Sequence, residues 1–151
     1  YNYRLSDINC ALGIAQLERI EEILAARARV AACYDQLLAE HAPRIVRPCA
    51  PPPGMTRSWF VYAVQLPPGS TADQRNALIT HLRARGIGCN HYFPCIHLQP
   101  FYRAQCGYTP GDFPVTEDVS SRSIALPFFN RLTRDDIACV AQEVGAWLRT
   151  L

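Results

Sequence analysis

Apolar side chains recur every three or four residues through the first part of the chain, which is the spacing of an amphipathic helix. The pattern runs from Ser6 to about Glu40, and Ser6 or Asp7 can cap its start. Roughly 35 residues exceed the usual length of a helix in a globular protein, so we expect a bend or break between Gly13 and Ile23. The pattern therefore predicts one long, interrupted helical segment.

Two later runs of aromatic and β-branched residues have the composition of strands. They extend over residues 59–66 and 87–93, and the apolar spacing between them predicts a helix over residues 72–85. A short third strand is expected over residues 124–126, before a last helix that Thr133 caps. The expected order is helix, strand, helix, strand, loop, strand and helix, which indicates a small α/β domain.

Prolines and glycines mark the segments expected to lack regular structure. Prolines cluster between residues 43 and 53, which predicts a linker. Gly86 can end the helix expected over residues 72–85. Residues 94–114 are rich in proline, glycine and aromatic side chains and are interpreted as a surface loop. Because loops on a rigid scaffold often carry functional residues, this segment is a candidate site.

The composition is that of a globular domain. The 151 residues are 49% hydrophobic and 19% charged, which is too apolar for disorder. The net charge of +2 is spread along the chain without a basic stripe, so we expect no nucleic-acid partner. No apolar run approaches the ~20 residues that span a bilayer, and residues 1–4 lack the features of a signal peptide. We expect no membrane association and a cytoplasmic location.

All 15 basic residues are arginine, and the chain contains no lysine. A lysine amine can lose its proton and condense with an aldehyde, whereas a guanidinium group stays charged and is a poor nucleophile. No side chain of this sequence can therefore form an internal aldimine with an aldehyde cofactor.

The seven cysteines are odd in number and include no C-x-x-C pair, so free thiols in a reducing compartment are expected. Cys89, His91, Cys95 and His97 supply ligand types that zinc prefers. Pro94 interrupts this segment, and its spacing lacks the tight knuckle of structural zinc sites, so we expect no metal. No orienting partner for a Cys–His nucleophile is recognisable either. Incidental thiols are the main interpretation and a redox role is the alternative.

Several segments together resemble the DegT/DnrJ/StrS family of sugar aminotransferases. They are YNYRLSDI at residues 1–8, ALGIAQL at 11–17, YFPCIHLQPFY at 92–102, GY at 107–108 and GDFPVTE at 111–117. Their order and spacing match the family over essentially the whole chain. The resemblance is therefore much more specific than any one of the segments.

The resemblance implies the C-terminal part of a fold type I enzyme that depends on pyridoxal phosphate (PLP). In this family a large domain with the cofactor-binding lysine precedes the matched region. Residues 1–41 would be a linking helical segment and residues 42–151 the small C-terminal domain. That domain would have a three-stranded, mainly antiparallel sheet with helices packed on one face.

The resemblance also implies a function for the complete protein. Family members work as homodimers and move an amino group from glutamate to a nucleotide-linked keto sugar, in the biosynthesis of amino sugars and polysaccharides. PLP supplies the electron sink, and the protein supplies position and charge. The alternative is a non-catalytic domain of the same fold, either stand-alone or sensor-like, that binds a ligand only.

Six positions on the matched segments acquire roles from the family. Asn2 would reach the PLP phosphate of the other subunit. Arg4 would bind a substrate phosphate or carboxylate near the dimer interface, or else pair with Asp7 to shape the loop. His97 would bind the diphosphate of the sugar nucleotide, with a structural role as its alternative.

The aromatic residues of the same segment complete the expected site. Tyr92, Phe101 and Tyr102 would stack on the base or form a wall of the sugar pocket, although plain packing is as good an interpretation. Asp112 lies in the Gly-Asp-Phe-Pro sequence, which we interpret mainly as a structural turn.

Overall fold

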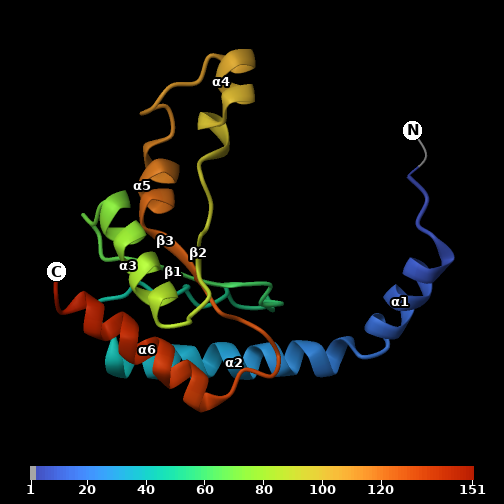
Figure 1. Ribbon diagram of the computed structural model, residues 1–151. Coiled ribbons are helices and arrows are strands. Elements are labelled where there is room, and N and C mark those ends of the chain that lie inside the picture. Colours follow the sequence, from blue (N-terminus) through green and yellow to red (C-terminus); the bar gives the residue numbers. More distant parts are fainter. Residues whose placement is uncertain (1–2) are drawn as a thin grey trace.

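The computed structural model describes residues 3–151, which form an α/β unit of six α-helices, one 3₁₀ helix and a three-stranded sheet (Figure 1). The helices α2, α3 and α6 form a layer on one face of the sheet. A separate layer of short helices, α4 and α5, extends from one end of the sheet. The predicted fold class is confirmed.

The first helical segment is interrupted within the predicted interval. Helix α1 spans Asp7–Leu17 and α2 spans Ile20–His41, with the break at residues 18–19. The hydroxyl of Ser6 accepts a hydrogen bond from the amide of Asn9 at 3.3 Å, so Ser6 is the cap. Figure 1 shows the two helices meeting at a sharp angle.

The sheet consists of β1 (Tyr62–Gln65), β2 (Asn90–His91) and β3 (Ser123–Leu126), in the order β1-β3-β2 and antiparallel throughout. Its register pairs Tyr62 with Leu126 and Val64 with Ile124. Since side chains alternate across a strand, these four residues share one face, and all four are buried. This face carries the core.

Three helices cover the core face. They are the C-terminal half of α2, then α3 (Ala72–Ala84) and α6 (Arg134–Leu148). Thr133 caps α6 through a reciprocal bond with Asp136, as predicted for its start. The side chains of α2 enter the core from Val30 onward. The domain boundary at residue 41 remains a prediction, but part of the linking helix packs in the core of the small domain.

Two of the predicted strands are shorter than expected. Only residues 62–65 of the run 59–66 pair as a strand. Trp59 has a positive φ of 51°, which is incompatible with an extended strand, so the strand cannot begin there. Only residues 90–91 of the run 87–93 do so. The edge strand β2 pairs with β3 alone. In the antiparallel register, the residue after His91 lies opposite Ser123, where β3 begins, so the strand pairing ends at this point.

The prediction of a loop over residues 94–114 was wrong in part. The segment contains the 3₁₀ helix η1 (Ile96–Leu98) and the helix α4 (Pro100–Cys106), and α5 (Pro114–Arg122) follows at once. Both α4 and α5 begin with proline at the first helical turn, where its missing N–H costs nothing. Pro100 and Pro114 therefore start helices, although prolines in such a segment are more typical of breaks in regular structure.

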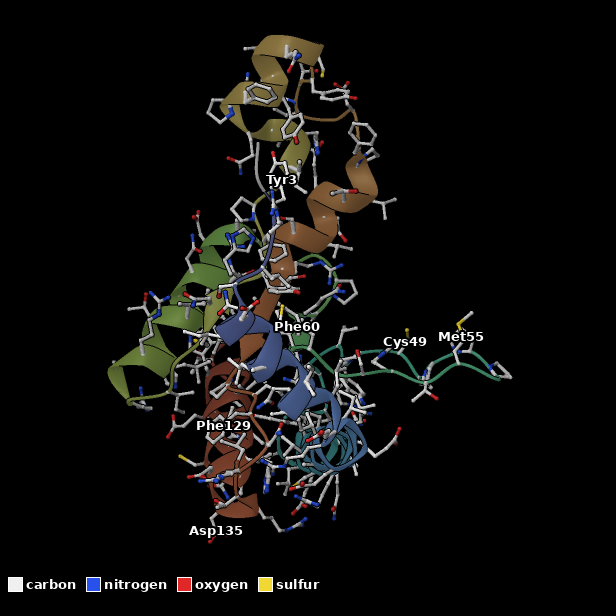
Figure 2. The ribbon with its side chains drawn as sticks, turned by 90° about the vertical axis from the view of Figure 1, so that its right-hand side faces the viewer. Tyr3, Cys49, Met55, Phe60, Phe129 and Asp135 are labelled. Atoms are coloured by element: carbon white, nitrogen blue, oxygen red, sulfur yellow. The ribbon has the colours of Figure 1, made fainter. Side chains whose placement is uncertain are left out.

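Helix α1 contributes no buried side chain, although it carries apolar residues such as Ile8, Leu12 and Leu17. Figure 2 shows α1 in front of the body, and the irregular segment with Cys49 and Met55 extending to one side. Among the helices of residues 3–151, none is both long and apolar enough to cross a membrane.

Candidate functional site

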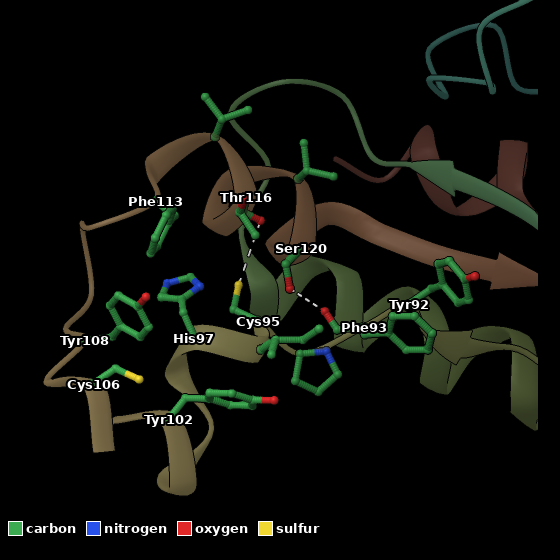
Figure 3. A pocket seen from close by; sticks show the side chains of 14 residues that line it. Tyr92, Phe93, Cys95, His97, Tyr102, Cys106, Tyr108, Phe113, Thr116 and Ser120 are labelled. Carbon is green, nitrogen blue, oxygen red and sulfur yellow. Dashed lines mark hydrogen bonds between the residues drawn. The ribbon is translucent and has the colours of Figure 1, made fainter. Parts of the chain in front are cut away.

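An open pocket of about 690 Å³ lies between α4, α5 and the segment that follows β2. Six rings line it, and we call it the aromatic pocket; they belong to Tyr92, Phe93, His97, Tyr102, Tyr108 and Phe113 (Figure 3). The thiols of Cys95 and Cys106 and the hydroxyls of Thr116 and Ser120 also lie in its wall.

Turns between α4 and α5 place the rings of Tyr108 and Phe113 against His97 in η1. Gly107 ends α4 in the left-handed conformation, with φ of 73°, and Gly111 follows with φ of 99°. The carboxylate of Asp112 accepts a hydrogen bond from the amide of Thr109 at 2.7 Å. This bond closes the turn, as the structural interpretation of the Gly-Asp-Phe-Pro sequence expects.

His97 lies in η1 and is buried, with 8% of its surface exposed. Its Nε2 lies 3.1 Å from Oε1 of Glu117. The ring centroids of Phe113 and Tyr108 lie 4.8 and 6.3 Å from that of the imidazole. Figure 3 shows the imidazole between these two rings. The contacts fix both the position and the plane of the ring.

Glu117 binds the turn as well as the imidazole. Its carboxylate accepts hydrogen bonds from the amide of Gly111 at 2.9 and 3.0 Å and from the amide of Phe113 at 3.3 Å. The Gly111 amide is the main cause that holds the pKa of Glu117 below its usual value, and His97 adds to it. Glu117 is therefore a carboxylate at neutral pH and can only accept hydrogen bonds.

Ser120 joins the pocket to the rest of the domain. Its carbonyl oxygen accepts from Nε2 of His91 at 2.9 Å and from Arg75 at 3.1 Å. Burial lowers the pKa of both His91 and Arg75. The Ser120 hydroxyl donates to the carbonyl of Phe93. These bonds tie α5 to β2 and α3, so we assign them a structural role.

The structure brings together three of the predicted substrate residues. Tyr92, His97 and Tyr102 line the aromatic pocket. Phe101 does not line it and is 65% exposed, with its ring edge-on to that of Tyr102 at 5.3 Å. Of the three aromatic residues predicted to contact the substrate, Tyr92 and Tyr102 thus line the pocket, and Phe101 lies on the outer surface of α4.

The two residues assigned to the cofactor and dimer region are Asn2 and Arg4. Asn2 is outside the described residues. Arg4 is exposed on the segment before α1 and is not part of the aromatic pocket. Asp7 is exposed as well, so a buried Arg4–Asp7 pair is not present within this chain.

The sequence predicted no substrate or cofactor role for Tyr108, Phe113 or Glu117, although all three lie in the matched segments. A signal for Glu117 was available, because a glutamate in the first turn after Pro114 is placed to accept from the amides that precede a helix. The contact of Glu117 with His97 had no signal, because 20 residues separate them in the chain.

The chain has two chemical limits as a cofactor site. It offers no lysine to an aldehyde cofactor. Among residues 3–151, no group of three or more histidine, cysteine, aspartate or glutamate side chains is arranged to hold a metal ion, and the seven cysteines are unpaired. The pocket suits a ligand with a planar or apolar part and a polar group that reaches the buried imidazole.

The sequence profile of the DegT/DnrJ/EryC1/StrS aminotransferase family matches residues 1–145. The chain is 32% identical over 138 residues to dTDP-4-dehydro-2,3,6-trideoxy-D-glucose 4-aminotransferase of Saccharopolyspora spinosa, covering 91% of this chain and 33% of that protein. It is 28% identical over 145 residues to the spore coat polysaccharide biosynthesis protein SpsC of Bacillus subtilis, covering 95% of this chain and 37% of SpsC.

A solved structure has the same fold. The PLP form of Spr1654 from Streptococcus pneumoniae, a protein assigned as a sugar aminotransferase, superposes with a TM-score of 0.88 over 97% of this chain and 36% of its own, at 22% identity. The chain thus spans little more than a third of the length of the relatives that it matches.

Proposed function

The chain belongs to the DegT/DnrJ/EryC1/StrS aminotransferase family, and on this premise we propose that the complete protein moves an amino group from glutamate to the keto carbon of a nucleotide-linked sugar. The family makes amino sugars and polysaccharides and uses PLP. When bound, PLP serves as the electron sink for the transfer of the amino group. The family match over residues 1–145 is the observation that carries the proposal.

In the complete protein, the lysine that holds PLP must come from outside these 151 residues, since they contain none. The present chain would contribute Asn2 to the PLP phosphate of the partner subunit in a homodimer. Arg4, exposed before α1, would bind a phosphate or carboxylate at the same interface. We also propose that residues 1–41 link the cofactor domain to residues 42–151.

The aromatic pocket would receive the sugar nucleotide. Tyr92 and Tyr102 offer ring faces to the base or the sugar, and His97 offers a ring nitrogen to a polar group. Phe101, on the outer surface of α4, would reach a ligand only beyond the pocket described here. Glutamate is small and would bind next to the cofactor, away from these rings.

The test uses the full-length protein reconstituted with PLP. Glutamate should convert the cofactor to its amine form, and addition of a nucleotide-linked keto sugar should restore the aldehyde form, both followed by absorbance. Borohydride reduction and peptide mass spectrometry should place the cofactor on a lysine outside residues 1–151. The isolated 151-residue chain is the control and should retain no cofactor after dialysis. A full-length protein that binds nucleotide sugars without either conversion would support the non-catalytic alternative.

A further inference from the structure

We propose that Glu117 is a positioning residue, which fixes the tautomer of His97 and presents its other ring nitrogen, Nδ1, to the bound sugar nucleotide. This inference rests on the proposed function, because it assigns a task to one contact inside the proposed substrate pocket. Glu117 itself is absent from the lining of the pocket, whereas His97 is part of it. Any effect of the carboxylate on a ligand there would therefore pass through the imidazole.

The chemistry of the contact fixes where the proton lies. A carboxylate accepts hydrogen bonds and cannot donate them, so the 3.1 Å contact requires a proton on Nε2 of His97. In the neutral ring, Nδ1 then carries the free lone pair and accepts a hydrogen bond. In the imidazolium ion, Nδ1 donates instead and can bind a phosphate oxygen. Glu117 would balance that positive charge from the opposite side of the ring.

Nδ1 remains available for a ligand. The hydrogen bond of His97 within residues 3–151 uses Nε2, and no fully buried side-chain nitrogen or oxygen in this part of the chain lacks a partner. Nδ1 is therefore not a fully buried atom without a partner, although only 8% of the surface of His97 is exposed. The rings of Phe113 and Tyr108 restrict rotation, so Nδ1 keeps its direction.

A purely structural role for Glu117 makes a different prediction. The carboxylate also holds the turn that carries Phe113, through the amides of Gly111 and Phe113. Removing it could loosen the pocket wall without any help from His97. Asp112 provides a matched control, because its carboxylate holds the same turn through Thr109 and has no bond to His97.

The first experiment reads the tautomer directly in the full-length protein, by ¹⁵N NMR of the histidine rings at neutral and higher pH. His97→Gln identifies the signals. We expect the neutral ring of His97 to carry its proton on Nε2. A neutral ring with its proton on Nδ1 would overturn the proposed geometry, whatever reaction the protein catalyses.

The second experiment is a double-mutant cycle on the binding of UDP and dTDP to the full-length protein. His97→Ala and Glu117→Ala should each weaken binding by about tenfold, as expected for one hydrogen bond to a charged group. In the His97→Ala background, Glu117→Ala should have an effect of less than about twofold. Asp112→Ala should weaken binding equally in both backgrounds. Circular dichroism and thermal unfolding verify that each variant is folded.

The outcomes separate this inference from the proposed function. If Glu117→Ala weakens binding equally with and without His97, or has no effect, Glu117 serves the turn only and the inference is wrong. If both nucleotides bind and the cycle shows coupling, but no transamination occurs, the inference stands and the proposed reaction fails. If neither nucleotide binds the wild-type protein, the assignment of Nδ1 to a nucleotide is wrong, and the tautomer measurement still tests the Glu117–His97 geometry.

Discussion

The carbonyl oxygen of His41 occupies the space in which a side chain on Gly145 would begin. A Cβ built on Gly145 would lie 2.0 Å from this oxygen and 2.9 Å from its carbon. Because both atoms belong to the backbone at the end of α2, neither can move aside cheaply. Gly145 thus sets how closely α6 approaches the C-terminal end of α2, on which the core layer depends.

Gly145→Ala should destabilise the protein by about 1–3 kcal/mol or more, because the added methyl group forces α6 away from α2. Gly13→Ala is the matched control: Gly13 also lies within a helix, and a Cβ there would meet nothing within 4 Å. The control should be neutral or slightly stabilising, since alanine is the better helix former. Thermal unfolding of both variants of the full-length protein provides the measurement, and similar melting temperatures would contradict the packing argument.

Tyr62 should make the protein sensitive to alkali. Burial is the main cause that raises its pKa well above 10.0, and the hydrogen bond to Asp35, at 2.5 Å, raises it further. A group whose pKa rises on folding contributes its full stability below the unfolded pKa, and this contribution is lost as the pH increases above it. Stability should thus fall above about pH 10, with tyrosinate absorbance appearing as the protein unfolds.

The variant Tyr62→Phe separates the two contributions. It should cost about 1 kcal/mol at neutral pH, through the lost hydrogen bond, and should move the alkaline unfolding midpoint to higher pH. Tyr102→Phe, on a half-exposed ring of the aromatic pocket, should leave the alkaline midpoint unchanged. An unchanged midpoint in Tyr62→Phe would mean that another group controls the transition.

Glu117 should contribute to stability at neutral pH and lose this contribution in acid. Hydrogen bonds from Gly111 and then His97 lower its pKa below the usual 4.5. The contribution is full above the unfolded pKa and disappears as the pH falls through the lower folded value. Denaturation curves below about pH 4.5 should therefore be less pH-dependent in Glu117→Gln than in the wild type. Glu21→Gln, on the exposed surface of α2, should follow the wild type.

His97→Ala in the full-length enzyme should affect the two half-reactions unequally. The loss of a hydrogen bond to a charged ligand group should raise the KM for the keto sugar about tenfold or more. The glutamate half-reaction should change little, because glutamate would bind next to the cofactor. Single-turnover measurements of each half-reaction decide the matter, and an equal loss in both would return His97 to a structural role.

Asn2→Ala should weaken PLP retention by about 1–3 kcal/mol, if the amide donates to the cofactor phosphate from the neighbouring subunit. Mixed dimers provide the sharper measurement. An Asn2→Ala subunit paired with a subunit that lacks the cofactor lysine should restore part of the activity, because one of the two sites is then intact. Complete lack of complementation would count against a shared site.

The sequence alone determined the features that depend on local periodicity and on chemical inventory. The spacing of apolar residues was sufficient for α2, α3 and α6, and the capping roles of Ser6 and Thr133 followed from residue types that satisfy free helix amides. The absence of lysine is likewise a property of composition. The matched segments, taken together, were sufficient for the family.

Tertiary structure decided where those elements end and which side chains meet. The strand over residues 59–66 was cut short at Trp59, and the edge strand ended where β3 offered no further partner, because strand length depends on pairing as well as propensity. Within residues 94–114, residues 96–98 and 100–106 became helical, and Pro100 occupies the first turn of α4. The contact between His97 and Glu117 required η1 and α5 to pack together, and no local pattern encodes a contact across 20 residues.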